Sequence, residues 1–133
     1  MNKIWLCSIS LLLLVGCATE APDAKQAATF IEDFLEKTGK GNFENLSDYY
    51  SEEMKFGESD DVREEKMKKL FDVMGPVEKF ELLETQTDDD WERPTVTLVY
   101  KVVHSSMTSI ETYTVKVERK GYKILRQNVE SSK

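Results

Sequence analysis

Cysteine and histidine are scarce in this sequence. The 133 residues include two cysteines, Cys7 and Cys17, and one histidine, His104. Two thiols cannot form the several bonds of a small disulfide scaffold, which excludes that class of fold. A zinc site needs three or four histidine, cysteine or carboxylate ligands, and a Ser-His-Asp arrangement needs a central histidine. We therefore expect no metal ion and no cofactor, and histidine-based catalysis would have to use His104.

Excess positive charge and long apolar runs are missing as well. The chain has 25 acidic and 18 basic side chains, a formal net charge of -7 and a sequence pI near 4.8. This balance argues against nucleic acid as a partner, because phosphate backbones attract basic surfaces. The longest apolar run spans 12 residues, 4–15, and is interrupted only by Ser8 and Ser10, whereas a transmembrane helix needs about 20 apolar residues. The composition is typical of one globular domain with a modest core.

The apolar run has the form of a signal peptide. Lys3 supplies a positive start, and the run that follows matches an h-region of about 7–15 residues. It ends in Leu14-Val15-Gly16-Cys17, which resembles the lipobox of bacterial lipoproteins. The resemblance implies cleavage before Cys17, a thioether from its sulfur to diacylglycerol, and acylation of the new amino group. The alternative is an ordinary secretory signal in which this cysteine has no such role.

This interpretation divides the chain into a signal peptide (1–16), a lipidated tether (17–24) and a single α+β domain (25–133). Acylation accounts for an unpaired cysteine in an exported protein, and two or three acyl chains anchor it firmly. Ala18 stands where lipoproteins retained in the inner membrane usually carry aspartate. The resemblance therefore implies the outer membrane facing the periplasm in a Gram-negative cell, or the outer face of the plasma membrane in a Gram-positive cell.

Apolar residues repeat with helical periodicity through the first half of the domain. Ala27, Phe30, Ile31, Phe34 and Leu35 recur at the spacing of one helix face. Three helices follow from this periodicity and from the capping residues. They are a helix from Lys25, N-capped by Asp23 and ended by Gly39 at C′; a short helix over Phe43–Tyr50; and a helix over Val62–Met74, capped by Asp61 with Glu64 and stopped by Gly75-Pro76.

In the second half the apolar residues alternate, which predicts strands. The segment Thr95–His104 has apolar residues on both faces, so we expect it in the middle of a sheet. Lys120-Gly121 is expected to form a two-residue hairpin turn. The predicted strands are Val77–Thr85, Thr95–His104, Ile110–Arg119 and Tyr122–Val129, with Val117 opposite Ile124 and Glu118 opposite Lys123.

These elements predict an α+β domain of three N-terminal helices packed on a curved antiparallel four-stranded sheet. Over residues 24–129 the chain resembles the nuclear-transport-factor-2-like (cystatin-like) superfamily, and more narrowly small bacterial lipoproteins of unknown function with that fold. The residues that carry the resemblance are Ala28, Phe30 and Phe34; Gly41-Asn42-Phe43 leading into Asp48-Tyr49-Tyr50; and Glu111-x-Tyr113-x-Val115 through Gly121-Tyr122-Lys123-Ile124-Leu125.

The resemblance implies a cone whose mouth binds small apolar ligands in some members, while others are isomerases, dehydratases or polyketide cyclases. None of their catalytic constellations matches this sequence residue by residue, so no catalytic residue is assigned. A base in such an enzyme would be His104, Tyr100 or a helix carboxylate. The candidate pocket lining, which would equally suit a closed core, is Phe30, Phe34, Tyr100, His104, Tyr113 and Ile124.

The loop between the first two predicted strands is acidic and holds one tryptophan. Asp88-Asp89-Asp90 with Glu92 could offer oxygen ligands to Ca²⁺, but the spacing is not that of an EF-hand, which favours a solvated loop. Trp91 either folds back as a lid on the core or contacts a partner. The loop is therefore no metal site, and its tryptophan is open to two interpretations.

Charge is divided along the chain. Residues 17–94 contain 22 acidic and 10 basic side chains, whereas residues 95–133 contain 3 acidic and 7 basic ones. The basic strands either contact an anionic headgroup, glycan or acidic protein, or balance the acidic helices of the same domain. The candidate contact residues are Lys116, Arg119, Lys120, Lys123 and Arg126.

The sequence thus predicts a cell-envelope lipoprotein, attached to the membrane through acylated Cys17, whose domain is a non-catalytic binding or interaction module. Its partner would be an envelope protein or a small apolar ligand. A third class is an inhibitor or assembly subunit that uses the basic hairpin or an exposed sheet face, for instance as a homodimer. The alternative is a small isomerase- or cyclase-like enzyme that acts on a hydrophobic substrate in the cone-shaped pocket.

Overall fold

The computed structural model describes residues 20–132. The predicted signal peptide, the lipobox and Cys17 lie outside the described residues. None of the described helices combines the length and the apolar character that crossing a membrane requires. The elements are α1 (Ala24–Gly39), the 3-10 helix η1 (Leu46–Tyr49), α2 (Glu52–Gly57), α3 (Asp60–Met74), β1 (Val77–Asp88), β2 (Thr95–His104), β3 (Thr108–Glu118) and β4 (Gly121–Ser131).

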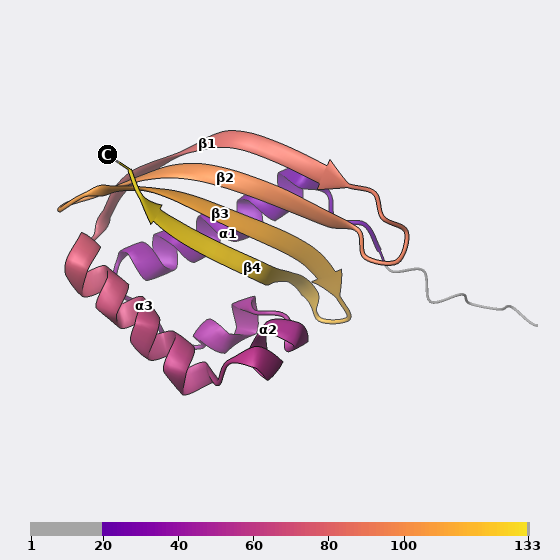
Figure 1. Ribbon diagram of the computed structural model, residues 1–133, viewed down its shortest axis with the longest axis horizontal. Helices are drawn as coiled ribbons and strands as arrows, with labels where there is room; N and C mark the ends of the chain where they lie inside the picture. Colours follow the sequence, from indigo (N-terminus) through magenta and orange to yellow (C-terminus); the bar gives the residue numbers. More distant parts are fainter. Residues whose placement is uncertain (1–19, 133) are drawn as a thin grey trace, which may run out of the picture.

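The four strands form one antiparallel sheet in the order β1-β2-β3-β4, so each strand pairs with its neighbour in the chain. The sheet curves around α1, while α2 contacts β4, and α3 contacts both α1 and η1 (Figure 1). The edge strands β1 and β4 do not pair with each other, so the sheet stays open. The predicted α+β arrangement of three α-helices packed with a four-stranded antiparallel sheet is confirmed.

Helix α1 has the predicted N-cap at Asp23, begins at Ala24, one residue before the predicted Lys25, and ends later than predicted. The side chain of Asp23 accepts a hydrogen bond from the backbone N–H of Gln26 at 2.9 Å, which caps the first turn. The expectation that Gly39 is the C′ residue is wrong, because Gly39 still belongs to the helix and Lys40 follows as C-cap. Gly41, with φ +77°, takes the left-handed conformation that ends helices.

Gly39 allows α1 to approach β1 closely. A Cβ atom at this position would lie 2.6 Å from Cβ of Val77 and 2.7 Å from its Cγ2. We expect Gly39→Ala to lower the free energy of unfolding by about 1–3 kcal/mol, as other overpacking substitutions do. Gly57→Ala is the matched control, since nothing lies within 4 Å of a Cβ there. Urea denaturation measures the free energy of unfolding of both variants. An equal loss of stability in Gly39→Ala and Gly57→Ala would refute the close approach of α1 to β1.

The short helix predicted over residues 43–50 is present only over Leu46–Tyr49, as the 3-10 helix η1. It follows Asn45, which takes the left-handed conformation at φ 54°. Tyr50 is extended and forms a parallel bridge with Ile124, and the N–H of Ser51 donates to the Ile124 carbonyl at 2.9 Å. Pairing with the edge of β4 thus competes with helix formation.

The short helix α2 was not predicted because none of its residues is buried, which leaves no apolar periodicity.

Helix α3 begins earlier than predicted. The hydroxyl of Ser59 accepts a hydrogen bond from the N–H of Val62 at 3.3 Å, so Ser59 is the N-cap and the predicted cap at Asp61 is wrong. Serine in an extended conformation satisfies the free N–H of the first turn, while Asp61 is already helical. The helix stops at Gly75, with φ +81°, as predicted.

The hairpin between β3 and β4 has a different register from the one predicted. Glu118 pairs with Gly121, so the turn residues are Arg119 and Lys120. Ile124 consequently pairs with Val115 instead of Val117, and both members of the new pair are fully buried. Val115 is fully buried and Val117 only partly, so the observed register gives Ile124 a core partner, which outweighs the preference of the turn sequence.

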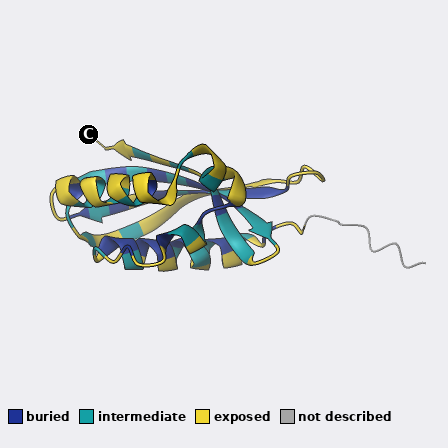
Figure 2. Ribbon diagram, turned by 90° about the horizontal axis from the view of Figure 1, so that it is seen from below, coloured by how far each residue is buried: buried dark blue, intermediate teal, exposed yellow. Residues whose placement is uncertain are grey.

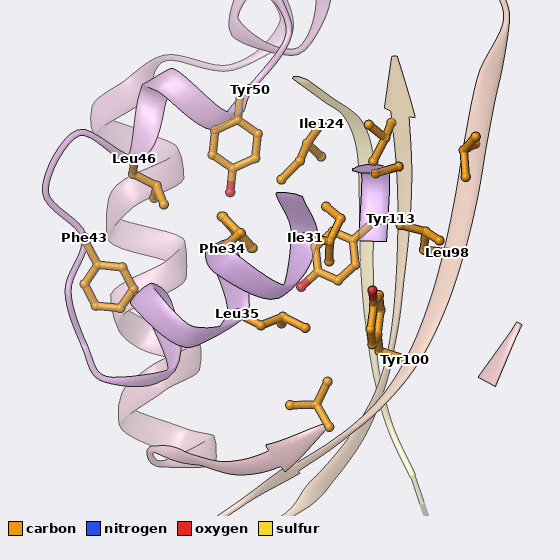
Figure 3. Close-up of a cluster of buried hydrophobic side chains, with 14 residues drawn as sticks. Ile31, Phe34, Leu35, Phe43, Leu46, Tyr50, Leu98, Tyr100, Tyr113 and Ile124 are labelled. Carbon is orange, nitrogen blue, oxygen red and sulfur yellow. The ribbon is translucent and has the colours of Figure 1, made fainter. Parts of the chain in front are cut away.

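The core lies between α1 and the inner face of the sheet, and buried residues follow the strands and the facing sides of the helices (Figure 2). The ring of Phe34 meets two tyrosine rings edge-on, Tyr50 at 6.1 Å and Tyr113 at 5.7 Å between centroids. Figure 3 shows these aromatic side chains with their aliphatic neighbours filling the space between helix and strands. Large side chains therefore fill the interior of the domain.

Candidate functional site

A buried polar network lies on the inner face of the sheet, where β2 ends and β3 begins. Its members are His104, Ser109, Glu111 and Tyr113. Tyr100, whose side chain points inward, pairs with Glu111 across β2 and β3, and the network residues of β3 alternate along the strand toward the same side. His104 is 7% exposed and Glu111 is 4% exposed. Charged groups buried to this extent need partners, and the network supplies them.

The side-chain nitrogens of His104 and the carboxylate oxygens of Glu111 each have a hydrogen-bonding neighbour. The Nδ1 of His104 lies 3.2 Å from the Gly75 carbonyl, and its Nε2 lies 3.0 Å from Oγ of Ser109 and 3.2 Å from Oε2 of Glu111. Ser109 donates to Oε2 of Glu111 at 2.6 Å, and Tyr113 donates to Oε1 at 2.5 Å. Both ring nitrogens face oxygen acceptors, which suits a doubly protonated imidazole.

The electrostatic environment favours an ion pair. Burial by itself lowers the pKa of His104, but the hydrogen bond and charge of Glu111, with the Gly75 carbonyl, raise the net pKa above its ordinary value. Burial by itself raises the pKa of Glu111, but hydrogen bonds from His104, Ser109 and Tyr113 bring the net pKa below its ordinary value. Burial and then the charge of Glu111 raise the pKa of Tyr113, which keeps this hydroxyl a donor.

The network borders a narrow cleft between α1, α3 and the sheet. His104 and Glu111 line it together with Gln127, and the cavity has a volume of about 30 Å³. That space holds about one or two water molecules. The cleft walls are apolar and include Leu35, Phe43, Met67, Phe71, Met74 and Val129. The site can thus exchange a proton with a molecule of the size of water, and a larger ligand would have to displace side chains of these walls.

The structure separates the six residues predicted to line one pocket. Phe34, Tyr100, Tyr113 and Ile124 are completely buried and pack in the core (Figure 3). Of the six, His104 alone lines the cleft. Phe30 lines a groove on the surface instead.

The candidate bases lie in two different places. The hydroxyl of Tyr100 lies 3.4 Å from the Ala28 carbonyl and 3.5 Å from Oε2 of Glu32, a carboxylate of α1. Burial, followed by the charge of Glu32, raises the pKa of Tyr100. His104 pairs with Glu111 instead. Tyr100 is therefore no proton acceptor near neutral pH, and the His104 network is the better candidate for acid-base chemistry.

The five basic residues of the last two strands do not form one patch. Lys116 contacts Glu53 of α2 at 3.1 Å and Glu118 at 3.5 Å. Lys120 and Lys123 line the same surface groove as Phe30, while the exposed Arg119 lies in the hairpin turn next to Lys120. The remaining residue, Arg126, borders another surface hollow. Part of the basic charge thus balances α2, as the second interpretation expected, and part stays free for a partner.

The acidic loop between β1 and β2 is organised by its own side chains. Asp88 accepts from the N–H of Asp90 at 3.1 Å, and Asp90 accepts from the N–H of Glu92 at 3.0 Å. Within residues 20–132 no group of three or more histidine, cysteine or carboxylate side chains is placed to hold a metal ion. Trp91 is 82% exposed, so its interpretation as a lid on the core is wrong.

Sequence reasoning missed Glu111, Ser109 and Gln127 as members of the site. The available signal was their position, because Ser109 and Glu111 have the same parity as the inward-facing Tyr113. A polar residue on the core face of a strand needs a buried partner, and His104 was the candidate at the end of the neighbouring strand. Gln127 carried no such signal, because a β-bulge opposite Thr114 and Val115, which no sequence pattern indicated, pairs it with the inward-facing Tyr113.

Neither a protein-family model nor a curated protein matches the chain. Among solved structures, the crystal structure of the intermembrane space region of the chloroplast protein ARC6 is similar, with 16% sequence identity and a TM-score of 0.47. The match covers 85% of this chain and 100% of that chain. A similarity at this level carries no conclusion about the family or the function of the chain.

Proposed function

We propose that this protein is a lipid-anchored binding module of the cell envelope with a nuclear-transport-factor-2-like domain, and that it is not an enzyme. The observation that carries the proposal is the filled interior. Phe34, Tyr100, Tyr113 and Ile124, which would line an open cone, are completely buried against one another. A module of this kind contacts its partner with its surface rather than enclosing a ligand.

Exposed aromatic residues support a surface function. Phe56 on α2 is 97% exposed, and Trp91 in the acidic loop is 82% exposed. Aromatic residues are enriched at the centres of protein interfaces, where they bury a large area with few rotatable bonds. An envelope protein is therefore the partner that we propose, with a second copy of this chain as the alternative. The anchor at Cys17 would hold the module at the outer membrane facing the periplasm, or outside the plasma membrane of a Gram-positive cell.

The anchor is tested by Cys17→Ser, with Cys7→Ser as the matched control. We expect the wild type and Cys7→Ser to fractionate with membranes and to enter the detergent phase of a Triton X-114 separation. Cys17→Ser should lose both properties, because no thioether forms and two or three acyl chains at about 0.8 kcal/mol per methylene are missing. Membrane fractionation of Cys17→Ser would contradict the lipid anchor.

Binding is tested with the anchored protein in solubilised envelope. Affinity purification with chemical cross-linking, followed by mass spectrometry, should recover one envelope protein or a second copy of the chain. The matched variant carries Phe56→Ser and Trp91→Ser, which alter exposed side chains only. Loss of cross-links in this variant supports the surface module, and equal recovery from both proteins contradicts the role of these two residues.

A second candidate function is acid-base catalysis on a small hydrophobic substrate. The His104–Glu111 pair in the lining of an apolar cleft favours it, since a histidine oriented by a carboxylate is a common acid-base unit. The present cleft of about 30 Å³ accepts no such substrate without movement of its walls. Turnover of a small hydrophobic substrate, lost in His104→Gln, would favour the enzyme over the binding module.

A further inference from the structure

A surface groove beside α1 combines aromatic rings with lysines, and we call it the aromatic–lysine groove. Phe30 of α1, Tyr49 of η1 and Tyr122 of β4 provide the rings. The centroid of Phe30 lies 5.6 Å from that of Tyr49 and 6.3 Å from that of Tyr122, so the three rings form one surface. Lys37, Lys120 and Lys123 border it, and the groove has a volume of about 500 Å³.

The lysines of the groove are positioned and still have free donors. Lys37 donates to the Glu44 carbonyl and lies 5.4 Å from the Tyr49 ring centroid, and Lys123 donates to the Asp48 carbonyl. An ammonium group has three N–H donors, so each of these two lysines retains donors for a ligand. Lys120 is exposed and makes no ion pair or side-chain hydrogen bond with residues 20–132.

Positive charge exceeds negative charge at the groove. Asp48 is the one carboxylate among its lining residues, against three lysines. Asp33 acts on Tyr49 from the side of α1 and weakens the positive field there. Because the rest of the domain is acidic, the groove is a positive region on a negative molecule. An anionic surface would attract this face and repel the others.

The groove lies next to the residue through which the tether joins the domain. The hydroxyl of Tyr122 accepts from the backbone N–H of Asp23 at 3.0 Å and donates to Gln26 at 3.0 Å. Figure 1 shows the start of α1 and the β3–β4 turn at the same end of the molecule. Cys17 precedes Asp23 by six residues, which span at most about 20 Å when fully extended. An acylated Cys17 would keep the groove close to the headgroups.

We propose that the aromatic–lysine groove docks on the anionic phosphate headgroups of the bilayer that holds the Cys17 anchor. This inference rests on the lipid anchor proposed above. The lysines pair with lipid phosphates, and the tyrosine and phenylalanine rings lie at headgroup level, where such rings are enriched. The anchor supplies the affinity, and the groove decides which face of the domain is turned toward the membrane.

The experiment uses the lipidated mature protein reconstituted in vesicles of phosphatidylcholine alone or mixed with phosphatidylglycerol. Acetylation rates of individual lysines, read by mass spectrometry, report which face is covered. A lysine close to an anionic surface contributes about 1 kcal/mol, or about fivefold in an equilibrium. We therefore expect acetylation of Lys37, Lys120 and Lys123 to slow about fivefold in anionic vesicles. The exposed Lys68 and Lys69 on α3 should keep their rates.

The variants compare one charge change on two faces. Lys120→Glu alters the groove, and Lys101→Glu alters the exposed outer face of β2. Lys120→Glu should restore fast acetylation of Lys37 and Lys123, while Lys101→Glu should leave the protection intact. Added salt should abolish the protection through screening.

Two results would overturn the proposal. Equal rates in neutral and anionic vesicles would exclude docking on phosphate, and protection of Lys68 and Lys69 would show that another face is turned to the bilayer. Loss of the wild-type protein from both kinds of vesicle during flotation is a separate outcome. It would remove the lipid anchor itself, and the docking inference with it.

Discussion

Glu111→Ala lowers the free energy of unfolding by about 3–5 kcal/mol at a pH between 4.5 and 6.5, which is the expected result when one member of a buried ion pair is removed. The substitution leaves His104 buried without its counter-charge, and it leaves the hydroxyls of Ser109 and Tyr113 without an acceptor. Chemical denaturation followed by circular dichroism measures the change. Glu81→Ala on the exposed part of β1 is the control and should change stability by less than about 0.5 kcal/mol.

The pH dependence distinguishes the ion pair from simple packing. The pKa of His104 is raised in the folded state. Its contribution to the free energy of unfolding is therefore complete below 6.5, the pKa in the unfolded chain, and is lost as the pH rises through the folded pKa. The pKa of Glu111 is lowered in the folded state. Its contribution to the free energy of unfolding is therefore complete above 4.5, the pKa in the unfolded chain, and is lost as the pH falls through the folded pKa. The stabilisation by the pair is therefore largest between these two values.

Glu111→Gln isolates this charge effect because it preserves the shape of the side chain and an oxygen acceptor. The stability difference between wild type and Glu111→Gln should be largest between pH 4.5 and 6.5 and should shrink on both sides of that window. The histidine resonances of the wild type, followed by NMR, should titrate above the ordinary histidine value. A stability difference that does not vary with pH would contradict the ion pair.

Arg63→Ala should destabilise the protein by about 3 kcal/mol and loosen the connection between α2 and α3. Arg63 is 3% exposed, and its guanidinium donates to the carbonyls of Met54 at 2.9 Å and Glu58 at 2.8 Å, and to Asp60 at 3.0 Å. Its Cζ also lies 4.5 Å from the centroid of the Tyr50 ring. One planar group thus joins the end of α2, the start of α3 and the core.

Two further variants test this geometry of Arg63. Arg63→Lys should recover little of the lost stability, because a single ammonium cannot reach two carbonyls and a carboxylate in the fork arrangement of arginine. Lys66→Ala removes a surface partner of Glu58 and should change stability by less than about 1 kcal/mol. Limited proteolysis near residues 52–58 should accelerate in Arg63→Ala and not in the control Lys66→Ala. Full stability of Arg63→Lys would show that charge alone, and not the planar fork, is required.

The long elements were predictable because their signals are local. The apolar repeat of Ala27, Ile31 and Phe34 and the cap at Asp23 define α1 without knowledge of the sheet. The alternation of apolar and polar residues in Thr95–His104 predicted both ends of β2 correctly. In contrast, the segment 43–50 was predicted only in part because its conformation depends on pairing of Tyr50 with β4, a contact between residues far apart in the chain.

The candidate site was predictable only in part. His104 was singled out as the one histidine, and the inward parity of Tyr113 was clear. The partnership of His104 with Glu111 depends on the turn between β2 and β3, which brings them within 3.2 Å. Arg63 was missed for a similar reason, because a charged residue on the apolar stripe of α3 is buried only when three acceptors converge on it.

The sequence by itself determined the class of fold, the position of the major helices and strands, and the resemblance to a lipoprotein leader, since each depends on residues that are neighbours in the chain. The tertiary structure decided how the interior is used. Phe34, Tyr100 and Tyr113 suit a pocket wall and a core equally well as a sequence pattern. Only the packing of α1 against the curved sheet turned them into core, because close packing depends on the separation of elements that no local pattern contains.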